Sequence, residues 1–389
     1  GNALVDMYAK CGVLAKAELV FKELPIQSIL SWNALIAGYV QQGQGYEALN
    51  CFERMQSEGL YPDGVTFTCV LTACGNSLAI DKGKQIHGQV VSRSLLETDI
   101  VLADALVNMY VKCGVVSKAH EVLKQLRYRD VVSWNALIGG YAEHGHALDV
   151  LQCFEEMQLQ GLCPNAVTFI HSLKACSAVD DVDKGEEIHF EIERRGLLER
   201  ELIGNTLVNM YAKCGLLSKS QQVFETLKVR DVVSWTSLIA GYAEHVDGER
   251  ALTCFEQMQV EGVSPNAVAL ICTLKACSNL GAPEKGQTIH AEIERQGLLE
   301  SDIVVGNSLV DMYARCGLFG IAQEVFDKLP VRDVISWNAL ITGYAEHGHV
   351  DDVLKCFDQM HLAGISPNYV TFVCCLKACA SIGAIDKGN

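Results

Sequence analysis

The sequence predicts an all-α fold, an α-solenoid superhelix built from stacked helix-turn-helix repeats. The first observation is a long internal period, because four tryptophans lie 102, 101 and 102 residues apart in the phrase SWNALI or, once, SWTSLI. The second is that apolar residues recur at helical spacing within each period, while no unit offers a convincing run of alternating strand residues. The tryptophans are Trp32, Trp134, Trp235 and Trp337.

Alignment on the tryptophan phrase divides the chain into twelve units of three types, of which the first and last are cut short. The 31-residue type occupies residues 1–28, 100–130, 201–231 and 303–333. The 35-residue type occupies residues 29–63, 131–165, 232–266 and 334–368. The third type, usually of 36 residues, occupies residues 64–99, 166–200, 267–302 and 369–389. All three lengths suit one helix-turn-helix repeat, so we expect a single repeat array over residues 1–389.

Each unit shows the apolar spacing of two antiparallel helices. In residues 29–63, Trp32, Leu35, Ile36 and Tyr39 follow the i, i+3, i+4, i+7 pattern, and a second stripe follows a Gln/Gly break. One helical pair is too small to bury its apolar stripe alone, so it has to stack on its neighbours. Stacking of this kind predicts a solenoid with a long concave surface.

The charge balance restricts the function classes that need to be considered. The formal net charge is −16, which argues against a protein that holds nucleic acid mainly by broad attraction to phosphates. No apolar run of 18 or more residues is present, so no membrane partner is expected. The chain starts inside the repeated pattern, and we therefore expect a cut made within a longer protein, with any targeting peptide outside this sequence.

The 17 cysteines are spread through the chain, and most recur at the repeat period. Periodic cysteines in a long chain favour reduced thiols over a disulfide framework. We expect three columns of them on apolar helical faces, as buried small hydrophobic side chains. The columns are Cys11, Cys113, Cys214 and Cys316; Cys51, Cys153, Cys254 and Cys356; and Cys74, Cys176, Cys277 and Cys379.

Two polar positions vary while their surroundings stay fixed. The fifth residues of the 31- and 35-residue units are Asn2, Asn33, Asp104, Asn135, Asn205, Thr236, Asn307 and Asn338. The last residues of the same units are Ser28, Asp63, Asp130, Asn165, Asp231, Asn266, Asp333 and Asn368. One interpretation is structural, since such residues satisfy backbone groups at turns and in first helical turns. The other is base selection, since Asn, Thr and Asp differ in donors and acceptors and the columns hold nothing bulky.

At these residues the sequence resembles the pentatricopeptide repeat proteins, in the land-plant subclass that alternates P, L and S motifs. The resemblance covers residues 1–389 in the order S-P-L, with S for the 31-residue, P for the 35-residue and L for the third type. The phrases that carry it are MYAKCG at Met7–Gly12, VSWNALI at Val132–Ile138, GYAEHG at Gly140–Gly145 and LKACSAV at Leu173–Val179.

The resemblance implies a superhelix that binds single-stranded RNA in its concave surface, one base per unit, with the fifth and last residues selecting the base. Asn with Asp then implies U, Asn with Asn implies C, Thr236 with Asn266 implies A, and Asn2 with Ser28 implies a pyrimidine, taken as C. Asp104 with Asp130 departs from the familiar pairs. L units carry Thr68, Ile170, Ile271 and Val373 at the fifth position and should read weakly or not at all. The implied target is approximately 5′-C-U-n-n-C-n-U-A-n-U-C-3′.

Two further columns are candidates for RNA contact. By family analogy the second residue of each S and P unit packs against base faces, and the alternative is an ordinary core residue near a helix start. The second residues are Leu30, Val101, Val132, Leu202, Val233, Val304 and Ile335. A basic column eight residues after the fifth position is placed to meet phosphates, and the alternative is a solvated basic surface. It consists of Lys10, Lys112, Lys213 and Arg315.

Catalysis is not expected in this chain. Editing proteins of this subclass often end in a zinc deaminase, whose signature combines His-x-Glu with Pro-Cys-x-x-Cys. His189-Phe-Glu191 and His290-Ala-Glu292 match the first half, but no Cys-x-x-Cys follows, and these histidines recur with His87 in the L units. A helix-surface or packing role is therefore favoured. We expect no catalytic residue, metal ligand or cofactor, and a deaminase would lie beyond Asn389.

Two functions remain open. The first is sequence-specific binding of organellar RNA, in the mitochondrion or chloroplast, as the target-recognition tract of a C-to-U editing factor; other editing factors are candidate partners, and no DNA partner is expected. The alternative is a protein-binding α-solenoid scaffold without RNA specificity, whose acidic balance suits a basic partner. The restricted variation in two columns favours RNA, because a peptide-binding surface should include larger anchoring residues.

Overall fold

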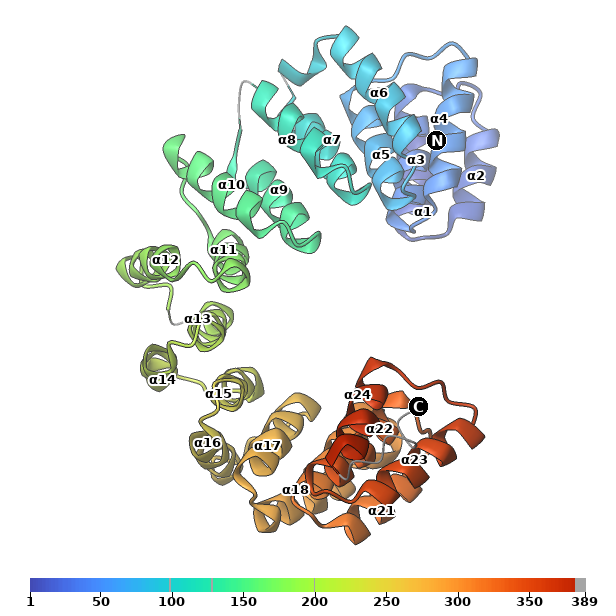
Figure 1. Ribbon diagram of the computed structural model, residues 1–389. Helices are drawn as coiled ribbons and strands as arrows, with labels where there is room; N and C mark the ends of the chain where they lie inside the picture. The colour runs from blue at the N-terminus through green and yellow to red at the C-terminus, as the bar shows by residue number, and fades with distance from the viewer. Residues whose placement is uncertain (98, 127–128, 199, 382–389) are drawn as a thin grey trace. The chain divides into compact units, whose positions relative to one another are not determined.

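The computed structural model describes residues 1–97, 99–126, 129–198 and 200–381 (Figure 1). Every regular element in these residues is a helix, which confirms the predicted all-α class. Most helices come in pairs, a first helix followed after a short turn by a second (Figure 1). No helix within the described ranges is long and apolar enough to cross a membrane.

The first helices of the repeats begin where the sequence pattern places the unit starts. They are α1 (Asn2–Lys10), α3 (Ile29–Gln41), α5 (Gly64–Asn76), α7 (Ile100–Lys112), α9 (Val131–Glu143), α11 (Ala166–Val179), α13 (Glu201–Lys213), α15 (Val232–Glu244), α17 (Ala267–Leu280), α20 (Ile303–Arg315), α22 (Val334–Glu346) and α24 (Tyr369–Ser381). From α3 onward, each of these helices starts at the first residue of a predicted unit.

The second helices complete the pairs. They are α2 (Leu14–Lys22), α4 (Gly45–Ser57), α6 (Ile80–Ser92), α8 (Val116–Gln125), α10 (Ala147–Leu159), α12 (Val182–Arg194), α14 (Leu217–Thr226), α16 (Gly248–Val260), α18 (Pro283–Arg295), α21 (Phe319–Lys328) and α23 (Val350–Leu362). Two short helices, η1 (Leu95–Glu97) and α19 (Leu298–Ser301), follow second helices of L units.

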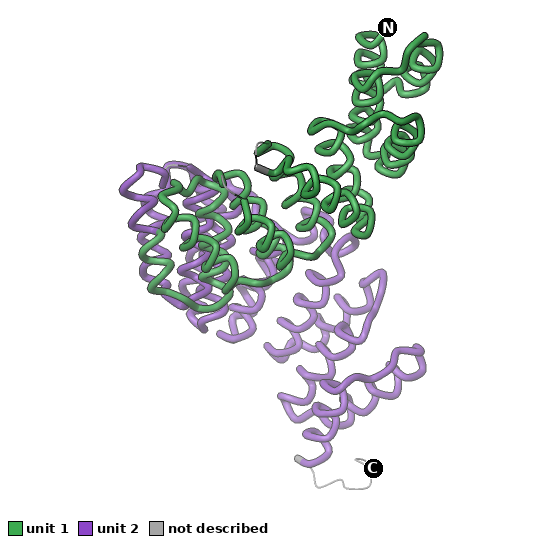
Figure 2. The backbone as a smooth tube through the Cα atoms, turned by 90° about the horizontal axis from the view of Figure 1, so that it is seen from above, with its two compact units in different colours: residues 1–188 green, residues 189–389 purple. Residues whose placement is uncertain are grey.

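The chain divides into two compact units, Gly1–Ile188 and His189–Asn389, with the boundary inside α12 (Figure 2). Within each unit the first helices contact one another in sequence, α1 through α11 in one and α13 through α24 in the other. A second helix packs on the first helix of its own repeat and on that of the next, as α4 does on α3 and α5 and α16 does on α15 and α17. Each unit is therefore a two-layered α-solenoid, as the sequence predicts.

Aromatic packing between successive repeats explains the tryptophan period. Trp32 is fully buried, and its ring meets that of Phe21 from the preceding repeat edge to face, with centroids 4.5 Å apart. Trp235 packs on Phe224 in the same way, also at 4.5 Å. Such pairs contribute about 0.5–1.5 kcal/mol beyond the burial of their area. The tryptophan column thus joins the second helix of one repeat to the first helix of the next.

The expectation that all three cysteine columns are buried is wrong for one of them. The columns that contain Cys51 and Cys74 are buried, whereas Cys11 is exposed and Cys113, Cys214 and Cys316 are partly exposed. These last four residues are the C-caps of first helices, directly before the glycine that turns the chain. Their exposure follows from the end of the helix, where the apolar stripe has already stopped.

One turn between paired helices holds a valine in a conformation that suits glycine. In three P units the turn contains Gly43, Gly145 or Gly348, with φ between +72° and +75°. The corresponding residue of the third P unit is Val246, with φ +63°. A β-branched side chain is strained in this left-handed region, so Val246 destabilises its turn relative to the other three.

Candidate nucleic-acid interface

The fifth and last residues of each unit lie side by side. In seven of the eight predicted pairs, hereafter reading pairs, the fifth residue donates a hydrogen bond to the last residue. The distances are 3.1 Å for Asn2–Ser28, 3.0 Å for Asn33–Asp63, 3.1 Å for Asn135–Asn165, 3.0 Å for Asn205–Asp231, 3.2 Å for Thr236–Asn266, 3.2 Å for Asn307–Asp333 and 3.0 Å for Asn338–Asn368. The two variable columns are therefore one row of polar pairs.

The last residues also cap the next helix, so the structural interpretation of that column is correct. Asp63 precedes α5, and its Oδ1 accepts from the backbone nitrogen of Thr66 at 2.8 Å. Asn165 caps α11 in the same way through its own Oδ1. Ser28 is the exception, since it makes no side-chain cap bond. Capping fixes the orientation of the last residue, because one of its two side-chain polar atoms is committed to the helix.

Capping leaves the second polar atom without a partner in several pairs. Within the described ranges, no protein group contacts Nδ2 of Asn165 or Asn368 or Oδ2 of Asp333 at hydrogen-bond distance. Burial opposes ionisation of Asp333, but hydrogen bonds from Ser336 and Asn307 outweigh it and lower the pKa of the carboxyl. The free atom is thus an N–H donor in Asn165 and Asn368 and a carboxylate acceptor in Asp333. In Asp63 and Asp231, Oδ2 also accepts from Nδ2 of the paired Asn.

The pair Asp104–Asp130 is built differently. Neither carboxylate can donate to the other, and both lie within hydrogen-bond distance of the Ser133 hydroxyl. Burial raises the pKa of Asp104, the bond from Ser133 opposes this shift, and the negative charge of Asp130 adds to it. This pair therefore lacks the direct bond that the other seven pairs share.

The second residues of the S and P units are not core residues. Their side chains are between 51% and 71% exposed, so the core interpretation of this column is wrong. The set is Leu30, Val101, Val132, Leu202, Val233, Val304 and Ile335. Each exposed apolar side chain lies three residues before a fifth residue on the same first helix. Contact with the face of a flat ring is consistent with this exposure.

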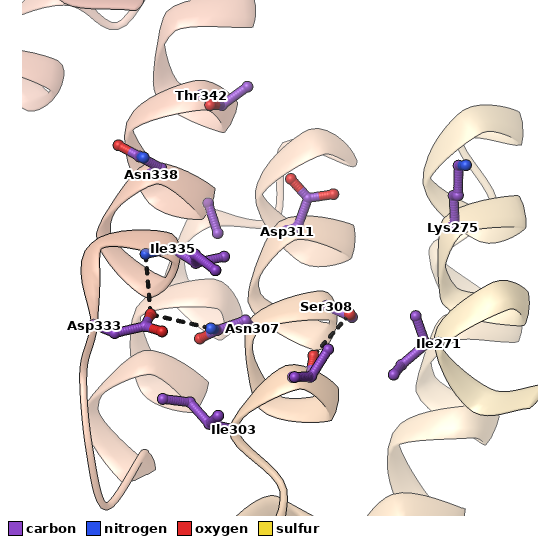
Figure 3. A pocket seen from close by; sticks show the side chains of 12 residues that line it. Ile271, Lys275, Ile303, Asn307, Ser308, Asp311, Asp333, Ile335, Asn338 and Thr342 are labelled. Carbon is purple, nitrogen blue, oxygen red and sulfur yellow. Dashed lines mark hydrogen bonds between the residues drawn. The ribbon is translucent and has the colours of Figure 1, made fainter. Parts of the chain in front are cut away.

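A cavity of about 350 Å³ brings these features together in the unit His189–Asn389 (Figure 3). It is lined by Val304 and Ile335 from two successive repeats, by the pair Asn307–Asp333 and by Asn338. In Figure 3, Asn307 and Asp333 point toward one another beneath Ile335. The cavity thus has apolar side chains from two successive repeats and a hydrogen-bonded polar pair, and its volume is at the small end of ligand sites.

The predicted basic column is mostly engaged with neighbouring side chains. Lys10 pairs with Asp6 at 2.8 Å, Arg315 pairs with Asp311 at 3.1 Å, and Lys112 donates to Asn76 at 2.7 Å. Lys213 is exposed. Phosphate contact by this column stays a prediction.

Sequence reasoning missed a second basic column. Lys275 from α17 lines the cavity, and it has no ion pair with any described residue (Figure 3). Lys174 and Lys377 occupy the corresponding position of two other L units. That recurrence is the signal in the sequence that could have found the column.

Sequence reasoning also missed a hydroxyl beside the fifth residue. Thr66, Thr168 and Thr371 each donate from Oγ1 to Oδ1 of an Asn in the preceding unit, at 2.7 Å in all three cases. Their acceptors are Asn33, Asn135 and Asn338. The signal is a column of Ser and Thr at the third position, which resembles an ordinary helix start when the sequence is considered alone.

The histidines of the incomplete deaminase motif have packing partners. Nδ1 of His87 lies 2.9 Å from the Tyr110 hydroxyl, His189 lies 2.9 Å from Tyr211, and His290 repeats the contact. The hydrogen bond from Arg194 lowers the pKa of Glu191 to about 2, because Arg195 adds to the effect and slight burial opposes it only in part. In the parts of the chain that the structure covers, no three His, Cys, Asp or Glu residues are grouped to hold a metal ion.

Two repeat models match the chain. The model described as "PPR repeat family" matches residues 27–76, 129–178, 230–279 and 332–381. The model described as "PPR repeat" matches residues 2–26, 103–131, 205–232 and 307–334. Together the matches recur along the chain with the period of the tryptophan phrase.

Curated relatives from Arabidopsis thaliana match the whole chain. The pentatricopeptide repeat-containing protein At3g02330, mitochondrial, is 34% identical over 407 residues, which cover 100% of this chain and 45% of the relative. The pentatricopeptide repeat-containing protein At1g11290, chloroplastic, is 34% identical over 387 residues, which cover 100% of this chain and 48% of the relative. The chain thus spans about half the length of the curated relatives it matches.

A solved structure has the same fold. The crystal structure of the pentatricopeptide repeat protein PPR10 in complex with an 18-nt psaJ RNA element matches with a TM-score of 0.80 and 17% identity. The match covers 100% of this chain and 58% of that chain. At this level of identity, the likeness shows the α-solenoid architecture.

Proposed function

This chain belongs to the pentatricopeptide repeat family, and we propose that it binds single-stranded RNA sequence-specifically, with one base for each reading pair. The observation that carries the proposal is the row of hydrogen-bonded reading pairs flanked by exposed apolar second residues. Base faces need apolar cover, and base edges need oriented donors and acceptors. The cavity at Asn307–Asp333 supplies both in a space suited to a small ring.

The free atom of the last residue gives a physical basis for separating U from C. Uracil presents a donor, N3–H, at the centre of its Watson–Crick edge, whereas cytosine presents an acceptor, N3, at the same place. The free carboxylate oxygen of Asp333 accepts from uracil and repels cytosine, and the free amide of Asn165 donates to cytosine. We extend this assignment to the equivalent pairs, so that the pairs with Asp select U and the pairs with two Asn select C. At Asp63 and Asp231 the oxygen that would face uracil also accepts from the paired Asn.

The remaining units follow the same logic. Thr236 is shorter than Asn, and its hydroxyl already donates within α15 or to Asn266, which leaves room for a purine, assigned as A. In the first L unit the Thr68 hydroxyl bonds to Gly64 O, and Ile170, Ile271 and Val373 have no hydrogen-bonding group. The proposed target is 5′-C-U-n-n-C-n-U-A-n-U-C-3′, in which n marks the L units and the pair Asp104–Asp130.

A finer assignment completes the proposal. The alternation of unit lengths supports the plant S-P-L subclass, and we infer that the chain is the target-recognition tract of an organellar C-to-U RNA editing factor. The relatives named mitochondrial or chloroplastic support an organelle, and the RNA held by PPR10 supports the class of ligand. Editing factors are further candidate partners, and the deaminase activity would belong to a segment outside this chain.

Binding to the proposed target tests this function. We expect the chain to shift a fluorescently labelled RNA of the sequence C-U-n-n-C-n-U-A-n-U-C at concentrations at least about tenfold lower than a scrambled RNA of the same composition. Equal binding of the two RNAs would remove sequence specificity from the proposal. Binding of neither would favour the protein-binding scaffold instead.

A further inference from the structure

A hydroxyl group accompanies the reading pairs. The third residue of every unit that follows a reading pair is Ser or Thr, with the single exception of Ala269. The hydroxyl residues are Ser31, Thr66, Ser133, Thr168, Ser234, Ser336 and Thr371. The units that follow an L unit carry Leu102, Ile203 or Val305 at the same position.

These apolar residues do not prevent capping, since Asp302 still caps α20 by accepting from the backbone of Val304 and Val305. Helix capping alone therefore does not explain the hydroxyl.

The three threonines contact the amide oxygen of the fifth residue, whereas its amide nitrogen donates to the last residue. Thr168 is fully buried, and its Oγ1 donates to Oδ1 of Asn135 at 2.7 Å. Nδ2 of the same Asn135 donates to Asn165 at 3.1 Å. Both ends of the Asn135 amide are thereby fixed, and its second N–H, which has no partner among the described residues, is available to a base. Thr66 and Thr371 repeat the arrangement at Asn33 and Asn338.

The S units show what happens without this bond. Oδ1 of Asn205 and of Asn307 is buried and has no hydrogen-bond partner among the described residues. The following serines turn elsewhere, because Ser234 donates to the backbone oxygen of Asp231 and Ser336 donates to the Asp333 carboxylate. Their fifth residues are held on one side only.

The exception supports the same role. Ala269 follows the pair Thr236–Asn266, whose fifth residue has no amide oxygen for a hydroxyl to hold. Thr236 instead bonds to Val232 O at 2.6 Å within its own helix and to Asn266 at 3.2 Å. The hydroxyl is thus missing after the one P unit whose fifth residue has no amide oxygen to orient.

We propose that Thr66, Thr168 and Thr371 are positioning residues that sharpen the base selectivity of the preceding unit by fixing the amide of its fifth residue. The proposal rests on the proposed RNA binding. It adds a third residue, contributed by the next repeat, to three of the four pairs in P units. Because the hydroxyl itself is fully buried, it acts through the Asn and not by touching the base.

Selectivity at the fifth base tests the proposal. Thr168→Val removes the hydroxyl at nearly constant shape, and Thr168→Ser keeps it. The measured ratio is the affinity for RNA with C at the fifth base divided by the affinity for RNA with U there. We expect Thr168→Val to lower this ratio about fivefold and Thr168→Ser to retain the wild-type ratio. Thr371→Val should act in the same way at the eleventh base. Unchanged ratios in both valine variants would overturn the proposal.

Ser336→Ala is the matched control, since Ser336 also completes a capping box but makes no bond to Asn307. We expect it to leave the preference for U over C at the tenth base intact. An equal loss of selectivity in Ser336→Ala and Thr168→Val would assign the effect to helix capping and overturn the positioning role. A wild-type chain without preference at the fifth base would instead contradict the proposed function, so the two failures are distinguishable.

A gain of selectivity tests the same idea in the opposite direction. Thr236→Asn creates a pair of two Asn residues beside Ala269, and the double variant Thr236→Asn/Ala269→Thr also supplies the hydroxyl. We expect the eighth base to change from A to C in both variants, with a C preference about fivefold larger in the double variant. Equal preferences in the two variants would show that the threonine adds nothing. Thermal unfolding of each variant checks that the repeats remain folded.

Discussion

The last residues Asn165 and Asp333 divide their polar atoms between the fold and the exposed edge. In Asn165, Oδ1 caps α11 and accepts from Asn135, which leaves Nδ2 free. In Asp333, Oδ1 has the same duties, and Oδ2 remains free. Structural and base-selecting interpretations of the last residue are therefore compatible. One atom of each side chain orients the other.

The pair Asp104–Asp130 gives a first prediction at this scale. Asp104→Asn creates the donor that the other Asn–Asp pairs have, and it removes a carboxyl whose burial and like-charged neighbour raise its pKa. We expect the free energy of unfolding of the variant to be about 1 kcal/mol higher than that of the wild type at pH 7. We also expect the variant to gain a preference for U at the fourth base. Denaturation in urea and binding to RNAs that differ at that base measure the two effects.

The pH dependence of that stability gain has a definite sign. A carboxyl whose pKa is raised in the folded state stabilises the fold below its ordinary pKa of 3.8 and loses this contribution as the pH rises through the folded-state value. The advantage of Asp104→Asn should therefore be small near pH 3.5 and reach its full size at neutral pH. A stability gain that decreases as the pH rises from about 3.5 to neutral would contradict the account of this pair.

The lysine that lines the cavity gives a second prediction. Lys275 is exposed and unpaired among the described residues, so Lys275→Gln should weaken binding of all RNA sequences by a similar factor. The slope of log Kd against log salt should fall by about 0.7, because the variant neutralises one phosphate fewer. The control is Lys285→Gln on α18, where the lysine pairs with Glu256 at 3.0 Å on the second-helix layer. Equal slopes for wild type and Lys275→Gln would exclude a phosphate at Lys275.

At the scale of helices and turns, the repeats depend on a tight connection within each helical pair. Three P units use a glycine with positive φ for this turn, and Val246 takes the same conformation in the remaining P unit, residues 232–266. A side chain with a Cβ costs about 1–2 kcal/mol in the left-handed region, and part of that is offset because glycine loses more chain entropy on folding. The turn before α16 is thus a local weak point compared with the same turn of the other P units.

Replacement of that valine gives a third prediction. We expect Val246→Gly to stabilise the chain by about 0.5–1 kcal/mol, measured as a higher urea midpoint. The control is Val260→Gly, because Val260 is also exposed to solvent but is the last residue of α16 and has ordinary helical geometry. That control should lower the midpoint. A lower midpoint for Val246→Gly as well would remove the strain argument.

At the scale of the whole chain, the proposed specificity for RNA has to come from many small contacts. The net charge of −16 limits non-specific attraction to phosphates. Electrostatic attraction therefore adds little to the affinity for RNA, whatever its sequence. Seven hydrogen-bonded pairs remain, and L units without a free polar group at the fifth position lie between them. Such a chain should discriminate RNAs through the sum of separate base positions.

Much of the fold was predictable because repetition amplifies every local signal. The starts of the first helices follow from the tryptophan phrase, since the pattern that buries Trp32 recurs with each period. The exposure of Cys11 and its column was not predictable from apolar spacing, because the helix ends at that residue. A periodic pattern identifies which residues are equivalent but does not say where each helix stops.

The candidate site was predictable in part for a similar reason. The columns of reading pairs are visible in the sequence, because polar residues vary there against a constant background. The hydrogen bond from Thr168 to Asn135 joins two successive units, and the two residues are 33 positions apart. It depends on the orientation of both side chains, which the spacing of residues in the sequence does not reveal. Lys275 was missed because it belongs to an L unit, and the three helices that line its cavity come from three successive units.

The most direct test of the central claim is an exchange of one base and one side chain. Asn165→Asp keeps the oxygen that caps α11 and replaces the free amide with a carboxylate oxygen. Binding is measured for wild type and variant, each with RNAs that carry C or U at the fifth base. We predict that wild type prefers C, that the variant prefers U, and that the coupling between the two changes is about tenfold or more. A variant that binds both RNAs more weakly by the same factor would contradict base selection by this pair.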